Sequence, residues 1–101
     1  MDRRLELHEL LCEAAGSRNV YFQPPASVVM KYPCIRYQLY NIDNTYADNT
    51  VYKQDVGYQI TVIDRDPDSE IVKRVSRLPR VRFNRQYMAD NLNHTVFVLY
   101  F

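Results

Sequence analysis

The last seven residues, 95–101, constrain the fold of this 101-residue chain more than any other stretch. They read Thr-Val-Phe-Val-Leu-Tyr-Phe, and such a short run of β-branched and aromatic residues indicates a β-strand. Successive side chains of a strand point to opposite faces. One face would carry Phe97, Leu99 and Phe101, and the other Val96, Val98 and Tyr100. Both faces are apolar, so we expect the chain's own helices to cover one and a second copy or a partner to cover the other.

Length and charge narrow the class of protein. The chain has the length of one domain, and we expect residues 1–101 to form a single domain. The net charge of +1 provides no overall field for gripping nucleic acid or an anionic membrane. No apolar window is long enough to span a bilayer, and residues 1–6 carry charge where a signal peptide is apolar. We therefore expect a protein that is made and used in a cytosol and contacts no membrane.

The first segment with helical periodicity covers residues 3–15. Its apolar stripe consists of Leu7, Leu10, Leu11, Ala14 and Ala15. Asp2 is the predicted N-cap, and Gly16 is the residue predicted to end the helix.

The second helical segment opens with Asp66-Pro67-Asp68-Ser69-Glu70. Asp66 is the predicted N-cap, and Pro67 suits the first helical position, where its missing N–H does no harm. The apolar stripe consists of Ile71, Val75 and Leu78. Pro79 is predicted to stop the helix.

Alternating or β-branched residues predict five strands. These strands cover residues 19–22, 34–40, 54–64, 81–87 and 95–101. The Asn- and Asp-rich segment 41–49 is interpreted as a loop or an extended hairpin tip, and 88–93 as a turn. The resulting order, α-β-β-β-α-β-β, predicts an α+β fold. We expect a small, mostly antiparallel sheet of about five strands with both helices packed on one face.

Groups that could carry chemistry are few. Cys12 and Cys34 are expected to be free and buried rather than disulfide-bonded. His8 and Cys12 have a spacing that two metal ligands can share, but a structural zinc site needs four ligands. Cys34 with His8 or His94 lacks the surroundings of a nucleophilic pair. The alternate carboxylates of 64–70 lack the glycine of a calcium loop. We therefore expect no catalytic residue, no metal site, no cofactor and no enzymatic activity.

The charges are divided along the chain. Residues 41–70 hold seven acidic side chains against two basic ones, and residues 71–85 hold six basic side chains and no acidic one. This division allows three interpretations: two solvated faces, head-to-tail pairing of acidic and basic edges in a ring, or phosphate contact by the arginines. The candidate subunit-interface residues are Asp66, Asp68, Glu70, Arg74, Arg77, Arg80, Arg82 and Tyr100. The candidate residues of a mobile, partner-contacting loop are Asp43, Asn44, Tyr46, Asp48 and Asn49.

Four segments carry a resemblance to a known group of proteins. They are Asn19-Val20-Tyr21-Phe22-Gln23-Pro24-Pro25, Tyr32-Pro33-Cys34-Ile35-Arg36-Tyr37, Asp66-Pro67-Asp68-Ser69 and Asp90-Asn91-Leu92-Asn93-His94. In these segments the chain resembles small neck proteins of long-tailed bacteriophages, of the tail terminator or head–tail joining group. The motifs are structural, and the resemblance extends over nearly the whole chain.

The resemblance implies a structural protein of the virion, assembled in the host cytoplasm. It would form a ring, typically of six copies, that caps the tail tube protein and joins it to the head–tail connector proteins. Genomic DNA would pass through the lumen without sequence-specific binding. The resemblance also implies a small antiparallel sheet with helices packed on it. Two alternatives stay open: a head-closure stopper or other connector or tail-tube ring protein, and a small enzyme or nucleic-acid-binding module.

Overall fold

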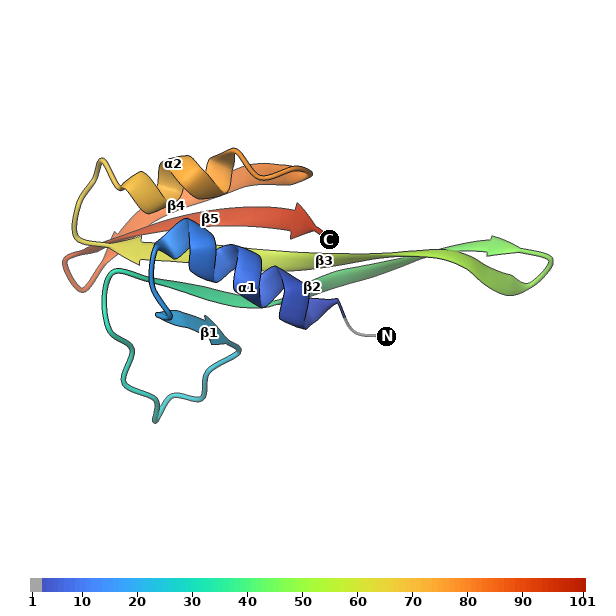
Figure 1. The fold of residues 1–101 in the computed structure, drawn as a ribbon, viewed down its shortest axis with the longest axis horizontal. Helices are drawn as coiled ribbons and strands as arrows, with labels where there is room; N and C mark the ends of the chain where they lie inside the picture. The colour runs from blue at the N-terminus through green and yellow to red at the C-terminus, as the bar shows by residue number, and fades with distance from the viewer. Residues whose placement is uncertain (1–2) are drawn as a thin grey trace.

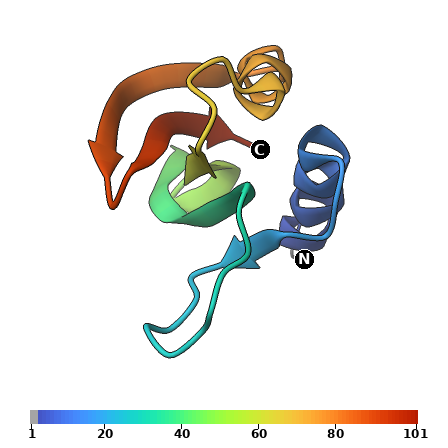
Figure 2. The same ribbon diagram turned by 90° about the vertical axis from the view of Figure 1, so that its left-hand side faces the viewer.

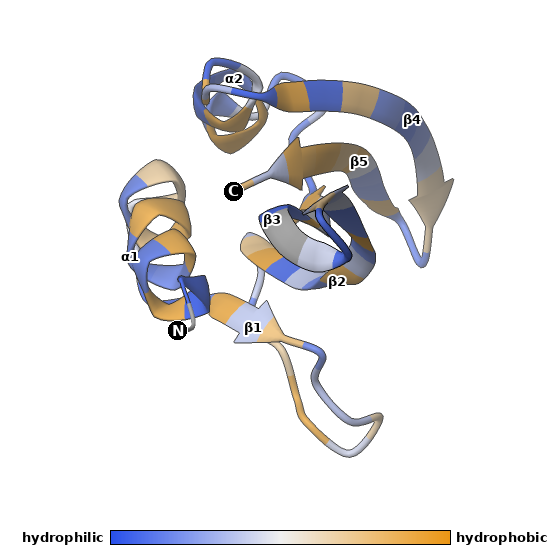
Figure 3. Ribbon diagram, turned by 90° about the vertical axis from the view of Figure 1, so that its right-hand side faces the viewer, coloured by the Kyte–Doolittle hydropathy of each residue, from blue (hydrophilic) through white to orange (hydrophobic). Residues whose placement is uncertain are grey.

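The computed structural model describes residues 3–101, without the side chains of Val51 and Tyr52. It confirms the predicted α+β fold and element order. The elements are α1 (Arg4–Ala15), β1 (Val20–Phe22), β2 (Cys34–Ala47), β3 (Thr50–Asp64), α2 (Glu70–Ser76), β4 (Val81–Ala89) and β5 (Leu92–Tyr100). Both helices lie on one side of the sheet, as Figures 2 and 3 show. None of the helices within 3–101 is long and apolar enough to cross a membrane.

The five strands form one sheet in the order β1-β2-β3-β5-β4, so β5 lies between β3 and β4 (Figure 1). Three of the four strand pairs are antiparallel, as predicted. The fourth pair, β1 with β2, is parallel, with Val20 opposite Ile35. The sheet is therefore mixed, because the segment 23–33 carries the chain back to the end of the sheet at which β1 begins.

The core lies between the sheet and the two helices. Its fully or almost fully buried side chains are Leu7 and Leu11 of α1, Ile71 and Val75 of α2, and Ile35, Tyr37, Ile60, Val62, Phe97 and Leu99 of the sheet. The predicted stripe of α1 is thus its buried face, although Leu10 is only half-buried. In α2 the predicted Ile71 and Val75 are buried, whereas Leu78 lies beyond the end of the helix. The Tyr37 hydroxyl is satisfied within this core, since it lies 2.8 Å from Nδ1 of His8 and accepts a hydrogen bond from Arg4.

On the opposite face of the sheet, part of β5 is covered from within the chain, so the expectation that a second copy or a partner covers this face of the strand applies only to the rest of it. At one end, Cys34, Ile63 and Leu92 form a second buried cluster, with Met30 of the segment 23–33 packed against it. On the same face of β5, Val96 is only 1% exposed. The half-buried side chains that remain on this face of the strand include Val98 and Tyr100. A partner is therefore not needed to bury most of β5.

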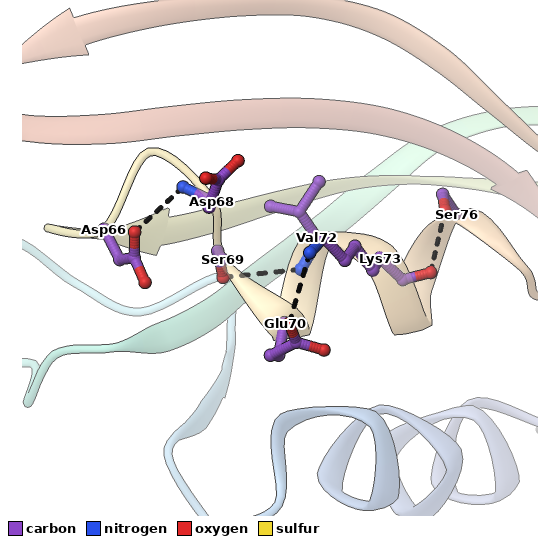
Figure 4. A network of polar contacts seen from close by, with 7 residues as sticks. All are labelled: Asp66, Asp68, Ser69, Glu70, Val72, Lys73 and Ser76. Carbon is purple, nitrogen blue, oxygen red and sulfur yellow. Dashed lines mark hydrogen bonds and ion pairs between the residues drawn. The ribbon is translucent and has the colours of Figure 1, made fainter.

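The start of α2 differs from the prediction. Asp66, Pro67 and Asp68 lie before the helix, and Ser69 is the N-cap, where its Oγ accepts a hydrogen bond from the Val72 N–H at 3.4 Å (Figure 4). The reason is local: the Asp66 carboxylate accepts from the Asp68 N–H at 2.9 Å, which favours a turn over a helix. The helix ends at Ser76.

For α1, only the predicted C-terminal end of the helix can be compared with the structure. The predicted N-cap, Asp2, lies outside the described residues, and the helix begins at Arg4 with Arg3 in the N-cap position. Gly16 ends the helix as predicted. It has a φ of 70°, a left-handed conformation that glycine adopts without a steric penalty, and its N–H bonds the carbonyls of Cys12 and Glu13.

The hairpins are longer and their turns tighter than the composition predicted. Residues 41–47 are strand, so the extended-hairpin interpretation of 41–49 is confirmed and the loop interpretation is wrong. The turn is only Asp48 and Asn49, with φ values of 54° and 63°. Asp90 and Asn91, with φ values of 53° and 62°, form the matching turn between β4 and β5. Such two-residue turns match the twist of the strands, so pairing continues up to the turn.

Candidate interaction surfaces: the hairpin arm and the β4 edge

The hairpin of β2 and β3 projects far beyond the rest of the fold (Figure 1). We call residues 41–55 the arm. β1 pairs only with residues 35–37 of β2, and β5 pairs only with residues 57–64 of β3. Within the described chain, both outer edges of the arm therefore have no strand beside them. The arm accounts for the elongated shape of the molecule, which measures 51 × 27 × 23 Å.

The arm holds the five residues that the sequence suggested as a partner-contacting loop. Asp43, Asn44, Tyr46, Asp48 and Asn49 are all exposed on it. Ile42 is also exposed, to 47%, and Tyr46 to 62%. None of the core side chains that the structure describes lies on the arm. Its described side chains therefore add little packing to the ladder that holds the hairpin together.

The edge of the sheet formed by β4 is the second open surface. β4 pairs with β5 on one side only, and seven of its nine residues, 82–88, are exposed. Phe83 is 58% exposed and Met88 67%. The other edge strand, β1, has only three residues and is soon followed by Pro24-Pro25, which cannot donate to a ladder. A long exposed edge such as β4 is a template for another strand.

The direction of the free backbone groups on β4 follows from its register. Ala89 and Leu92 flank the two-residue turn, so they form a hydrogen-bonded pair, and such pairs alternate along an antiparallel ladder. Tyr87 and Arg85 also bond to β5 by this alternation. The backbone N–H and C=O groups of Gln86 and Met88 then point away from β5. A bulge between Phe83 and Arg85 interrupts the ladder, so the regular open edge is Arg85–Ala89.

A groove of about 630 Å³ lies between β4, the end of β5 and Tyr40, the residue that precedes the arm. Its lining combines aromatic and arginine side chains from β4 with residues of β2 and β5. These residues are Tyr40, Arg80, Val81, Arg82, Phe83, Asn84, Val98 and Tyr100. Three of the predicted interface residues therefore come together in this groove: Arg80, Arg82 and Tyr100.

Three of the predicted interface residues are engaged within the chain. Arg80 forms an ion pair with Asp55 at 3.2 Å. The Nε atom of Arg74 donates to the Ala14 carbonyl at 2.6 Å, so this side chain links the two helices. Glu70 pairs with Lys73 one turn further along α2, at 3.2 Å. The acidic and basic segments are thus neighbours in the fold, and α2 does not separate them into two opposite edges.

The other members of the predicted set stand at the two ends of α2. Asp66 and Asp68 are exposed in the turn before the helix, and Arg77 is its exposed C-cap. The charges of the sheet that form no ion pair among residues 3–101 include Asp43 and Asp48 on the arm and Arg82 and Arg85 on β4. The sequence-based selection omitted Arg85, Phe83 and Met88. The signal that could have found them is their alternation along a strand that has no partner on one side.

The side chains that could carry chemistry, the two thiols and the His8 imidazole, are buried or half-buried in this fold. Cys12 and Cys34 are free and buried, and burial raises the pKa of both thiols, that of Cys34 to about 11. Burial, followed by the nearby Arg4 charge, lowers the pKa of His8, whose ring contacts the Tyr37 hydroxyl. Among residues 3–101, no three His, Cys, Asp or Glu side chains form a group that could hold a metal ion.

No protein-family model and no curated protein matches this chain. The features of the described chain that could serve a partner are the two open surfaces and the charges on them. The arm and the β4 edge are both main-chain surfaces with exposed apolar side chains. Such surfaces are suited to binding another polypeptide.

Proposed function

We propose that this protein is a tail terminator of a long-tailed bacteriophage, a structural subunit that forms a ring at the end of the tail tube. The observation that carries the proposal is the pair of open surfaces on one chain, a projecting arm and a bare strand edge. β5 separates β4 from β3, so the arm cannot pair with the β4 edge of its own sheet. Each surface is therefore available to a neighbouring molecule.

Two different surfaces on one chain favour a ring. When each copy uses one surface toward the copy before it and the other toward the copy after it, the contact is head-to-tail, and it closes into a ring if the rotation allows. The resemblance to neck proteins supplies the context. The ring, typically of six copies, would cap the tail tube protein and dock to the connector, with genomic DNA passing through its lumen at the neck of the virion.

Three other functions predict different binding. A head-closure stopper would bind the connector and leave tube ends free, and a tube subunit would assemble along the whole tube. A nucleic-acid-binding module is disfavoured by the net charge of +1, although Arg82 and Arg85 lie near Phe83 and Tyr87 on β4. Binding to single- and double-stranded DNA at low and high salt tests this last reading directly.

Electron microscopy of the purified full chain tests the proposed function. Negatively stained images should show rings, and mixing with purified tail tubes should add density at one end of each tube. A variant with the unrelated exposed residue Glu13 changed to Gln should behave in the same way. A protein that stays monomeric and binds no tube end would overturn the proposal. Coating along the tube would replace it by the tube-subunit alternative.

The arm should also respond to assembly. It has few packing contacts, so we expect amide hydrogens of residues 41–55 to exchange rapidly in the free protein and slowly in the ring. Hydrogen exchange followed by mass spectrometry gives the comparison, with α1 as an internal reference that should not change. Equal exchange of the arm in both states would mean that the arm is not a contact surface.

A further inference from the structure

We propose that the Arg85–Ala89 edge of β4 takes the arm of a second copy of this chain as an added β-strand. The inference rests on the proposed function in one respect: this contact would be the subunit contact of the ring. It specifies which surface binds which and by what bonds. The occupant is a second copy because the described chain itself carries the complementary strand.

The main chain supplies the first argument. The outward N–H and C=O groups of Gln86 and Met88 lie on an exposed edge, and the arm offers two outer edges whose own groups are equally unpaired. Pairing the two satisfies both sets of groups. Addition of a strand to an open edge is a recurring mode of polypeptide recognition, in which main-chain hydrogen bonds provide affinity and side chains provide specificity.

Charge supplies the second argument. The arm carries Asp43, Asp48 and Asp55 against Lys53, three acids and one base, a net charge of −2. Residues 80–89 carry three arginines and no acid, a net charge of +3. Asp55 is engaged with Arg80 within the chain, so the charges that remain for the partner are two carboxylates on the arm and two arginines on β4. Opposite charges on two edges favour their encounter and fix which strand pairs with which.

Exposed apolar side chains supply the third argument. The arm presents Ile42 and Tyr46, and β4 presents Phe83 and Met88, each exposed to between 47% and 67%. Strand addition would place these side chains next to one another across the new ladder, where apolar cross-strand pairs stabilise a sheet. Phe83 also contacts Phe97 of β5, with ring centroids 6.0 Å apart, but more than half of its side chain remains exposed.

The main competing arrangement is a two-fold pair in which two β4 edges meet. That arrangement would bring Arg82 and Arg85 of one copy toward the same arginines of the other, and like charges across a ladder are destabilising. It would also leave the arm without a partner. The arm-to-edge contact avoids both difficulties, and it is head-to-tail rather than two-fold.

The substitution Met88→Pro tests the backbone contact. Proline removes the N–H that points away from β5, so the β4–β5 ladder keeps its bonds while the outer ladder loses a donor. We expect self-association to weaken at least about tenfold, because a carbonyl of the partner is left unpaired. Met88→Ala, which keeps the N–H, is the matched control and should associate more tightly than the proline variant. Equal association of the two variants in analytical ultracentrifugation would refute the inference, provided that thermal unfolding shows both to be folded.

A shortened arm tests the other side of the contact. Asp43 and Asp55 face each other across the hairpin, so Asn-Gly in place of residues 44–54 should close a two-residue turn between them. This variant keeps the whole core and the β4 edge. Alone, the shortened-arm variant and the Met88→Pro variant should each be impaired in self-association.

Mixing the two variants distinguishes the arrangements. One has an intact edge and the other an intact arm, so the mixture should form a one-to-one complex that cannot grow further. A two-fold contact through β4 predicts instead that the shortened-arm variant pairs with itself and that the mixture gains nothing. Either of these two results would overturn the arm-to-edge contact. The mixing experiment needs no phage component, so its outcome is independent of whether the ring binds tail tubes.

Charge reversal provides a specificity test. Arg82→Glu with Arg85→Glu should weaken association, more at low salt than at high salt, because like charges would then face each other. Adding Asp43→Lys with Asp48→Lys to the same chain should restore part of it. Association that is unchanged by the first pair, or lost further with the second, would contradict the pairing of these two edges.

Discussion

The contact between Gly57 and Tyr100 allows a sharp test of how the arm is joined to the body. Gly57 lies on β3 directly opposite Tyr100 of β5. A Cβ atom added to Gly57 would lie 2.9 Å from Cε2 and 3.1 Å from Cζ of the tyrosine ring. The ring is restrained, because its hydroxyl accepts a hydrogen bond from Asn41 at 3.4 Å and the Arg80 guanidinium lies 5.9 Å from its centre. Gly57→Ala must therefore displace the ring.

The expected sign depends on the tyrosine. Alanine in a strand is favoured over glycine by about 0.5–1 kcal/mol, whereas overpacking costs about 1–3 kcal/mol. We expect Gly57→Ala to lower the free energy of unfolding by about 1 kcal/mol in the native sequence. With Tyr100→Ala already in place, the clash is absent, and Gly57→Ala should raise that free energy by about 0.5–1 kcal/mol.

Urea unfolding of the four proteins in this double-mutant cycle gives the coupling energy. Circular dichroism can follow the transition, and equal m values for the four proteins would show that the comparison is of stability alone. If Gly57→Ala stabilises both backgrounds to the same extent, the ring does not press on this glycine. The join between the arm and the body would then be looser than the structure indicates.

Three further outcomes are expected. Leu99→Asp should give no soluble, cooperatively melting protein, because the side chain is 1% exposed and a charge would be buried there without a partner; a normal melting curve would contradict this. Because Ser69 is the N-cap, Ser69→Ala should lower the free energy of unfolding by about 1 kcal/mol, and Asp66→Ala should lower it by less. Denaturant titration of the two variants gives the comparison. A larger effect of Asp66→Ala would mean that Asp66 is the cap. The pKa of His8 is lowered in the fold, so its contribution to stability is full above the usual pKa of 6.5 and is lost as the pH falls below that value. The melting temperature should therefore decrease as the pH falls below 6.5, and His8→Gln should make this decrease smaller.

Local patterns predicted the elements well because each depended on neighbouring residues. The stripe with Leu7 and Leu11 and the left-handed Gly16 were both readable along the chain. The position of β5 between β3 and β4 was not readable, because it depends on contacts between residues far apart. The composition of 41–49 was misleading, since Asp48 and Asn49 alone form the turn and the preceding residues continue the ladder.

The candidate surfaces were only partly predictable for the same reason. The sequence separates acidic 41–70 from basic 71–85, but folding places Asp55 against Arg80 and turns Arg74 toward the Ala14 carbonyl. Whether a charge is available to a partner depends on its neighbours in the folded structure. The spacing of residues along the chain does not reveal these neighbours. The arm was visible in the sequence as a polar stretch, and the open edge of β4 became visible only with the sheet order.

We expect the two buried thiols to react slowly with thiol reagents in the native protein. The thiolate is the reactive form, and burial both removes Cys12 and Cys34 from the reagent and keeps them protonated at neutral pH. A cysteine engineered on the arm could thus be labelled selectively with a fluorophore or a spin label, without removing the native ones. The rate at which Cys34 is modified would then report how often the fold opens. In the same sample the label would report motion of the arm, so the two processes could be followed separately.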